Sequence, residues 1–372
     1  YFITVLCLSE AKGMRVFMKK ISKIMSLVLA GVMVLSMTAC GGNTAETTAA
    51  ATEAQKETAA DTAAKAEETT EGETSESETA AKAEGTTYKI GVLQLVQHTA
   101  LDAANDGFIA ALDDAGIVYE VDQQNASGDQ SACQTVASKF ANEKKDLILA
   151  IATPAAQAMV GAVEDTPVLI TAVTDPAESG LVNTNEKPGA NVTGTSDLTP
   201  VKEQIDLLKQ LVPDARTVGV LYCSAESNSK IQADMAKEAI AAAGMQSKEY
   251  TVSSSNEIQT VVQSMVGAVD AVYAPTDNVI AAGMATVGMV AGDNKLPVIC
   301  GEAGMVQNGG LATYGIDYYQ LGYMTGQQAV KILTEGASPA DMPIEYLPAE
   351  KCELTVNEET AQTLGIDVSG AR

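Results

Sequence analysis

Much of this chain repeats one pattern, in which runs of apolar and β-branched residues alternate with stretches of helical periodicity. Residues 89–93, 146–151 and 166–170 predict strands, whereas 101–115 and 155–163 predict amphipathic helices. Continuously apolar strands that are separated by helices are typical of a parallel sheet covered on both faces. The sequence therefore predicts an α/β fold.

The pattern also occurs twice in the same order. Segments that begin at Lys89, Asp146 and Thr166 have counterparts that begin at Thr217, Asp270 and Leu296, at offsets of 124 to 130 residues. Because three matches keep their order, the sequence predicts two similarly built α/β lobes with a cleft between them.

Ligands of open α/β sheets bind beyond the carboxyl ends of the strands, where loops carry side chains and helix N-termini present N–H groups. The loops that follow the predicted strands are therefore the candidate site. In the first lobe they contribute Gln97, His98, Thr99, Thr153, Pro154, Ala155, Thr174 and Asp175, and in the second Ser224, Glu226, Asn228, Ser229, Thr276, Asp277, Asn278 and Glu302.

The pair Thr153-Pro154 predicts a helix start, with Thr153 as the N-cap and Pro154 at the first helical position. The amides of Ala155 and Ala156 would then face outward and suit a carboxylate. The alternative is a plain helix cap without a ligand. Asp277 offers the same choice, between an N-cap and an acceptor for an ammonium group.

Other candidates also keep two interpretations. Glu226 lies in a polar loop, where it is either a solvated surface charge or a cleft residue. His98 is the only histidine and is either a ligand contact or a cap. Asp175, which precedes a proline, is a turn residue unless it faces the ligand. Tyrosines 314, 318 and 319 either line an apolar pocket or pack between helices.

Composition excludes several classes of function. The formal charge of −25 argues against nucleic acid, whose phosphates require basic patches. Motifs for a zinc protease, a hydrolase nucleophile, a phosphate-binding loop or a dinucleotide site are absent, and one histidine hardly suffices for a triad or a zinc site. We expect no enzyme activity, no metal and no cofactor.

The first 86 residues have a different character. A basic stretch, 18–23, precedes an apolar run, 24–37, and small residues lead to Cys40, which is the order of a secretory signal peptide. Met-Thr-Ala-Cys resembles a bacterial lipobox, so Cys40 is the predicted lipidation site. Residues 44–85 are mainly Ala, Thr, Glu and Ser and predict a disordered tether. The residues before Met14 or Met18 resemble translated upstream sequence.

Four further cysteines are widely spaced, and the sequence does not decide whether they pair: Cys133, Cys223, Cys300 and Cys352. Cys223 and Cys300 fall in strand-like runs, where a buried thiol is the commoner case.

Several strings resemble the substrate-binding lipoproteins of ABC transporters, in the family that includes tryptophan- and tyrosine-type binding proteins. The resemblance covers about 88–366 and rests on ATPAAQ (152–157), AVTDPAESGLV (172–182), KPGANVTGTSD (187–197), ESNS (226–229), PTDN (275–278) and YGIDYYQLG (314–322). It implies a type I periplasmic-binding-protein fold, in which two Rossmann-like lobes with parallel sheets are joined by a three-crossover hinge. The expected segments are 1–39 for upstream residues and signal peptide, 40–86 for the lipidated cysteine and tether, 87–198 plus about 316–342 for lobe 1, and 199–315 plus about 343–372 for lobe 2.

The resemblance further implies a binding lipoprotein outside the cytoplasm, anchored to the bacterial cell membrane, which delivers a small solute to an ABC permease and its ATPase. It places an amino-acid carboxylate at Thr153, Ala155 and Ala156, and the ammonium near Asp277, with Glu226 or Asp317 as substitutes. Gln97, His98, Thr174, Asp175 and Asn228 complete the site. A monomer and hinges at 197–198 and 314–315 are expected.

An amino acid, with aromatic ones included, is the favoured solute, because the chain has no Trp and only four Phe for stacking on sugars. A nucleoside or sugar ligand, a sensor that presents its ligand to a membrane kinase, and a secreted enzyme remain as alternatives.

Overall fold

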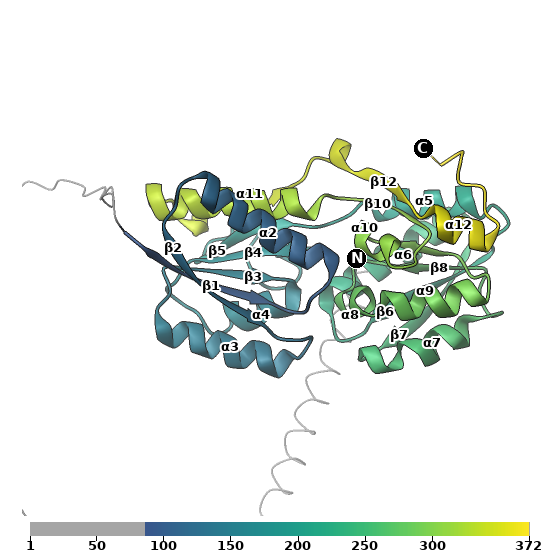
Figure 1. Ribbon diagram of the computed structural model, residues 1–372, viewed down its shortest axis with the longest axis horizontal. Coiled ribbons are helices and arrows are strands. Elements are labelled where there is room, and N and C mark those ends of the chain that lie inside the picture. Colours follow the sequence, from purple (N-terminus) through teal and green to yellow (C-terminus); the bar gives the residue numbers. More distant parts are fainter. Residues whose placement is uncertain (1–85, 372) are drawn as a thin grey trace, which may run out of the picture. The chain divides into compact units, whose positions relative to one another are not determined.

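The computed structural model describes residues 86–371, which form two α/β lobes with one six-stranded sheet each (Figure 1). The first lobe contains β1 (Tyr88–Gln94), α2 (Thr99–Asp114), β2 (Tyr119–Asn125), α3 (Gln130–Glu143), β3 (Leu147–Ile151), α4 (Thr153–Val160), β4 (Val168–Val173), β5 (Val192–Ser196), α11 (Tyr318–Val330), a π turn η2 (Lys331–Glu335), a 3₁₀ turn η3 (Pro339–Asp341) and β11 (Glu345–Tyr346). The second contains α5 (Val201–Leu211), β6 (Thr217–Cys223), α6 (Ser227–Ala242), β7 (Gln246–Val252), η1 (Ser255–Glu257), α7 (Ile258–Met265), β8 (Ala271–Ala274), α8 (Asn278–Ala282), α9 (Met284–Asp293), β9 (Val298–Cys300), α10 (Ala303–Gln307), β10 (Ala312–Gly315), β12 (Glu353–Val356) and α12 (Glu358–Leu364), with η4 (Ala349–Lys351) before β12.

The two sheets share one strand order. It runs β11-β5-β4-β3-β1-β2 in the first lobe and β12-β10-β9-β8-β6-β7 in the second. All pairs are parallel except β10 with β12. The predicted α/β fold with two similar lobes is confirmed.

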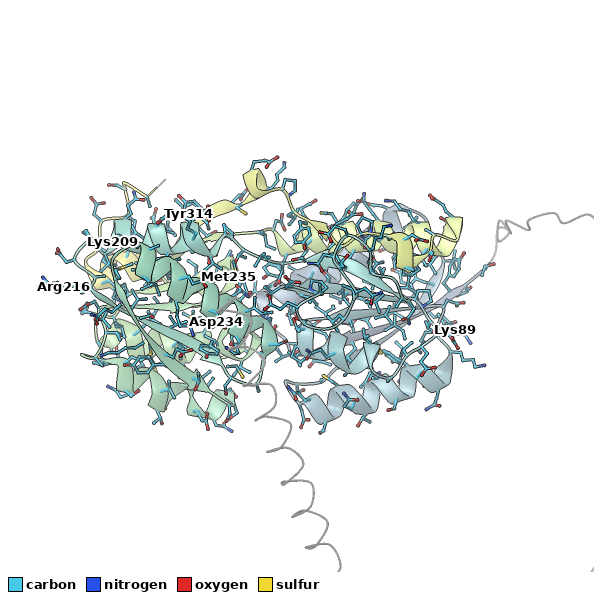
Figure 2. All side chains as sticks on the ribbon, turned by 180° about the vertical axis from the view of Figure 1, so that it is seen from behind. Lys89, Lys209, Arg216, Asp234, Met235 and Tyr314 are labelled. Atoms are coloured by element: carbon cyan, nitrogen blue, oxygen red, sulfur yellow. The ribbon has the colours of Figure 1, made fainter. Side chains whose placement is uncertain are left out.

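The sequence repeats fall on equivalent strands, β1 with β6, β3 with β8 and β4 with β9. The match extends to one hydrogen bond. Asp146 accepts from the Lys89 N–H at 2.8 Å, and Asp270 accepts from the N–H groups of Arg216 and Thr217 at 2.9 and 2.8 Å. Lys89 and Arg216 lie at the two outer ends in Figure 2, so the amino ends of the strands point away from the middle of the pair of lobes.

Three segments cross between the lobes, 197–200 after β5, 316–317 after β10 and 347–352 after β11. The expected hinge at 197–198 lies on the first crossing, and 314–315 ends β10 just before the second. β11 pairs with β5 in the first sheet. The third crossing therefore follows Tyr346, whereas the second lobe was expected to resume at about residue 343.

Helix α11 belongs to the first lobe because it packs along α2. Glycines permit this close contact. A Cβ on Gly107 would collide with the carbonyl oxygen of Tyr319, and one on Gly322 would collide with that of Ala104. Residues far apart in the sequence thus complete one lobe.

Both sheets are buried on their two faces by helices. Every residue of β3 and β4 is buried, in line with their apolar sequences. The edge strands β2 and β7 instead consist of partly buried and exposed residues, except for the buried Val252 at the end of β7. Their polar sequences did not predict strands.

The four cysteines of the described part are free thiols, three of them buried and Cys352 half-buried. Within residues 86–371 no helix is both long and apolar enough to cross a membrane. The predicted start, signal peptide and Cys40, and the tether except Thr86, lie outside the described residues.

Candidate functional site

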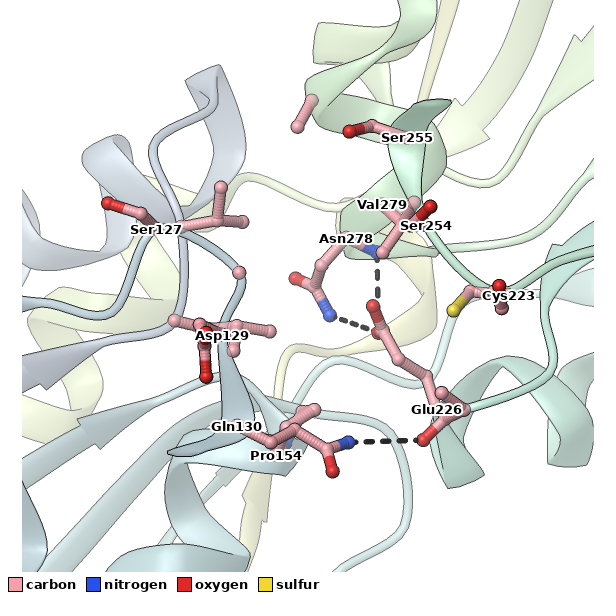
Figure 3. A pocket seen from close by; sticks show the side chains of 16 residues that line it. Ser127, Asp129, Gln130, Pro154, Cys223, Glu226, Ser254, Ser255, Asn278 and Val279 are labelled. Carbon is pink, nitrogen blue, oxygen red and sulfur yellow. Dashed lines mark hydrogen bonds between the residues drawn. The ribbon is translucent and has the colours of Figure 1, made fainter. Parts of the chain in front are cut away.

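The loops at the carboxyl ends of both sheets meet in one cleft. Its inner cavity has a volume of about 10 Å³, room for about one water molecule. The lining comes from both lobes and consists of His98, Leu101, Ala172, Asp197, Asn228, Thr276, Asp277, Asn278, Ala281, Glu302 and Tyr318. A wider outer pocket of about 490 Å³ shares Asn278 with it and adds Glu226 and residues 127–130 (Figure 3).

Glu226 is the centre of the polar side of the cleft. It is buried at 3 % exposure, and its Oε2 accepts from the Asn278 side chain at 2.5 Å and the Asn228 side chain at 3.2 Å. Figure 3 shows the carboxyl of Glu226 pointing to Asn278. Burial raises the pKa of Glu226, and the nearby charge of Asp277 raises it further. The interpretation as a solvated surface charge is wrong.

Asp277 is a helix cap. Its Oδ1 accepts from the Ile280 N–H at 2.8 Å at the start of α8, and its Oδ2 accepts from the Cys223 N–H at 2.5 Å. Burial raises its pKa despite these donors. Both carboxyl oxygens of Asp277 are therefore engaged by backbone groups within the second lobe.

Two more buried carboxyls complete the lining. Glu302 caps α10 by accepting from the N–H groups of Gly304 and Met305, and burial raises its pKa to about 7. Asp197 accepts from the Tyr318 hydroxyl at 2.8 Å and from the Thr174 hydroxyl at 3.2 Å. Burial raises the pKa of Asp197 to about 6.

No lysine or arginine lines the inner cavity or the outer pocket among the described residues. His98 reaches across the cleft, with its Nε2 3.3 Å from the Asn278 Oδ1. Burial lowers the pKa of His98, which favours the neutral ring near pH 7. The described lining thus combines carboxyls and neutral polar groups with no lysine or arginine.

The first-lobe side is built on the start of α4. The N-cap is Ala152, not Thr153, and it provides no side-chain hydrogen bond. Thr153 is the first helical residue, because the chain turns one residue earlier than predicted. The Ala156 N–H donates to the Ala152 carbonyl at 3.0 Å, so it does not face outward as expected. Since Pro154 has no N–H, the first-turn amides left for a ligand are those of Thr153 and Ala155.

Backbone strain marks the same edge of the first lobe. Ala152 has φ 82° and ψ 151°, a region that is essentially restricted to glycine. Ala172, which lines the inner cavity, has φ 55° where the pairing of β4 with β5 shifts register. Strained residues and bulges concentrate at functional sites.

Three predicted site residues carry buried polar atoms without a hydrogen-bond partner in the described structure. These are the Nδ1 of His98, the Oγ1 of Thr153 and the Oδ1 of Asn228. Buried polar groups normally have partners, so each such atom requires an explanation. A ligand with donors and acceptors would supply one.

The remaining candidates are placed as follows. Asp175 accepts from the N–H groups of Ala177 and Glu178 and is a turn residue. Asp317 is an exposed cap of α11, in a separate depression beside Glu302. Gln97 is exposed, and Ser229 is buried against Asn228. Their part in ligand binding stays a prediction.

The sequence did not reveal the full role of four residues. Glu302 appeared only as a loop candidate, Asp197 only as a hinge position and Tyr318 only as a packing aromatic. Gln232, which was not considered, is fully buried and hydrogen-bonded to Thr174 and Thr276. Its position one helical turn after Asn228 was the available signal.

The duplicated lobes and the cleft between them define a class, the two-lobed periplasmic binding proteins, and the comparisons identify the family. Residues 89–371 match the family described as ABC transporter substrate binding protein, and the chain belongs to that family. The resemblance noted from the sequence is thereby confirmed.

Particular relatives have more specific names. The chain is 40% identical over 352 residues to the Tyrosine-binding protein of Clostridioides difficile strain R20291, covering 93% of each chain. A Streptococcus pneumonia ABC domain in complex with L-Trp is 39% identical, with a TM-score of 0.74 over 77% of this chain and 97% of that one. A ligand-free, open substrate-binding protein with adhesive properties from Clostridium difficile is 46% identical, with a TM-score of 0.60 over the same shares.

Proposed function

We propose that this protein captures an aromatic amino acid, tryptophan or tyrosine, for an ABC importer. The observation that carries the proposal is a cleft whose described lining holds buried carboxyls and no lysine or arginine. Such a lining favours an ammonium group and leaves a carboxylate to neutral N–H and O–H donors. The names of the relatives that bind tyrosine and L-Trp support the same ligand class.

Glu226 is the proposed partner of the ammonium group. Both oxygens of Asp277 already accept backbone hydrogen bonds, whereas Glu226 Oε1 accepts none of those described. Asp277 would support the site by holding the start of α8. This differs from the expectation that Asp277 binds the ammonium and Glu226 substitutes for it.

The ligand carboxylate is assigned to the start of α4. The free amides of Thr153 and Ala155 and the unpartnered Thr153 hydroxyl provide donors there. The partial positive charge of a helix N-terminus adds to them. The Asn228 Oδ1 would accept from the ammonium group.

Capture requires the lobes to separate. The inner cavity holds about one water molecule, too little for an amino acid. The fold also superposes better on the L-Trp complex than on the open relative, although its sequence is closer to the latter. We infer that the described arrangement is closed, and that a ligand enters when the lobes swing apart.

The same proposal includes delivery of the ligand to a permease and its ATPase. It also includes anchoring through lipidated Cys40, a location outside the cytoplasm and a monomeric state. The family membership supports the delivery. A sensor would have the same cleft but would deliver to no permease, so solute uptake after deletion of the gene separates the two.

Calorimetric titration of the purified protein tests the ligand. L-Trp and L-Tyr should bind, and two truncated probes should bind about a hundredfold more weakly, because hydrogen bonds to charged groups contribute about 1.5 to 3 kcal/mol. The probes are tryptamine, which lacks the carboxylate, and indole-3-propionate, which lacks the ammonium group. Binding of a sugar or nucleoside without any amino acid would overturn the ligand and leave the family assignment unchanged.

A further inference from the structure

One buried glutamine joins the two lobes. Gln232, on α6 of the second lobe, is fully buried, and its Nε2 donates to the hydroxyl of Thr174 in the first lobe at 3.0 Å. The same amide nitrogen donates to the hydroxyl of Thr276, which lies in the loop after β8 of the second lobe. A single side chain amide thus holds the loops after β4 and β8 together.

Other side-chain bonds between the lobes are less protected. The contact of His98 with Asn278 is only partly buried. The bonds from Gln157 to Ser227 and from Gln130 to the Ala225 carbonyl are exposed, at 3.3 and 3.4 Å. Water replaces exposed partners at little cost, but a buried bond that breaks must be replaced by hydration of every freed group.

Further hydrogen bonds connect Thr174 with the two crossing segments nearest the cleft. Thr174 donates its one hydroxyl hydrogen to Asp197 on the first crossing, at 3.2 Å. Asp197 also accepts from Tyr318, the residue directly after the second crossing, at 2.8 Å. The chain of bonds Thr276–Gln232–Thr174–Asp197–Tyr318 therefore runs from the second lobe through both crossings.

The side-chain amide of Gln232 matches the donors and acceptors around it. The Gln232 amide provides two hydrogens to two hydroxyls, and its Oε1 accepts from the Thr276 N–H at 3.4 Å and the Thr199 hydroxyl at 3.5 Å. A carboxylate at this position would lack both hydrogens, and an apolar side chain would lack all four bonds. Only an amide fits the closed arrangement.

We propose that Gln232 is a positioning residue that latches the lobes in the closed arrangement, by bonding across the cleft to Thr174 and, through it, to both crossing segments. Gln232 itself is not among the residues that are proposed to contact the ligand. Its role is to set how much of the protein is closed before a ligand arrives, which affects the apparent affinity. The latch rests on the proposed function for the inference that the described arrangement is closed and for the affinity readout.

The matched control is Gln204, another fully buried glutamine of the second lobe. Its Nε2 donates to the carbonyls of Gly301 and Tyr314 at 3.0 and 2.7 Å, and its Oε1 accepts from Tyr273 at 2.7 Å. All of these partners lie in its own lobe. Gln204→Met therefore removes a comparable set of buried bonds without touching the first lobe.

The test measures the distance between the lobes in the full chain without ligand, by double electron–electron resonance. Spin labels are attached through an encoded non-natural side chain at exposed Asp106 and Glu238, so that the native thiols remain. Gln232→Met should shift the distribution to longer distances, whereas Gln204→Met should lower the melting temperature and leave the distances as in the wild type. Equal distributions for wild type and Gln232→Met, or equal shifts for both variants, would overturn the latch.

A double-mutant cycle tests whether Gln232 acts through Thr174. In a Thr174→Val background the distance shift from Gln232→Met should nearly vanish, because the bond across the lobes is already lost. Additive shifts would contradict the proposal. With L-Trp as the probe, Gln232→Met should bind about tenfold more weakly and Gln204→Met as well as the wild type. A wild-type protein that ignores L-Trp would overturn the ligand proposal, and the ligand-free distances would still decide on the latch.

Discussion

The two lobes have the same strand order but present different chemistry to the cleft. The first lobe contributes small residues, hydroxyls and backbone amides, and two alanines in positive φ regions. The second contributes the carboxyls Glu226, Asp277 and Glu302. The duplicated framework thus determines where the loops meet, whereas the loop residues differ between the lobes and, in the proposed function, would select which end of an amino acid each lobe binds. Four predictions test this division.

The largest effect concerns the carboxyl side. Burial raises the pKa of Glu302 to about 7, above the ordinary value of 4.5 that applies to the unfolded chain. The native state therefore holds this proton more tightly, and stability that is complete below about pH 4.5 is lost as the pH rises through 7. Its contribution is about 3 kcal/mol. Chemical denaturation between pH 4 and 8 should show this loss in the wild type and a flatter profile in Glu302→Gln, and an unchanged slope would contradict it.

Replacing Glu226 should affect the ligand instead. Glu226→Gln should weaken L-Trp binding about a hundredfold, because a hydrogen-bonded charge pair is lost. Wild-type affinity should rise with pH through the raised pKa of Glu226, since the ammonium group prefers the ionised carboxyl, and the variant should lose this dependence. Titrations at pH 6 and 8 measure both. The control is Asp234→Asn, which changes a half-exposed acid on α6, the helix that Glu226 caps (Figure 2); a similar loss there would remove the special role of Glu226.

Thr153 tests the uncharged hydrogen-bond donors of the first lobe. Thr153→Val should weaken L-Trp binding about tenfold through loss of one hydroxyl donor. The same change should stabilise the ligand-free protein by about 1 kcal/mol, because a buried hydroxyl without a partner is removed. For this one variant, calorimetry should thus show a lower affinity for L-Trp, and thermal melts should show a higher melting temperature. A loss of both affinity and stability would mean that the hydroxyl has a structural partner.

The smallest effect separates two buried alanines of the first lobe. Ala150 lies within β3, whereas Ala152 has φ 82°. Glycine costs packing at both positions but relieves strain only at the second, so Ala152→Gly should be less destabilising than Ala150→Gly by about 1 kcal/mol. Urea denaturation of the pair checks this difference. Equal losses would show that Ala152 stores no strain.

The sequence predicted the framework well because buried parallel strands are apolar throughout. The predicted strand 146–151 matches β3 to within one residue, whereas 166–170 begins two residues before β4 and covers its first half. The edge strands β2 and β7 were missed, since each has one neighbouring strand and many polar side chains. Apolar periodicity reports burial on both faces, and an edge strand lacks it.

The structure brings the predicted loops together but changes several of their details. Strand ends fix where loops lie, so Glu226, Asn278 and His98 meet at one cleft, and their part in ligand binding stays a prediction. The identity of the free amides depends on the residue at which α4 begins. N-cap propensity favours Thr153 over Ala152, but Ala152 is the N-cap in the structure. Asp197 and Tyr318 approach the cleft on crossing segments, and their meeting depends on tertiary structure that local patterns do not encode.

The packing of α2 against α11 has a consequence for how the chain acquires its structure. Contacts such as Gly107 with Tyr319 join residues more than two hundred positions apart, and everything from α5 to β10 lies between them. The lobe that is synthesised first must therefore wait for the end of the chain, while the inserted lobe meets most of its own strands sooner. Long-range closure of this kind slows folding. If the protein is exported as proposed, such a delay would favour its passage, because a narrow export channel admits only an unfolded chain.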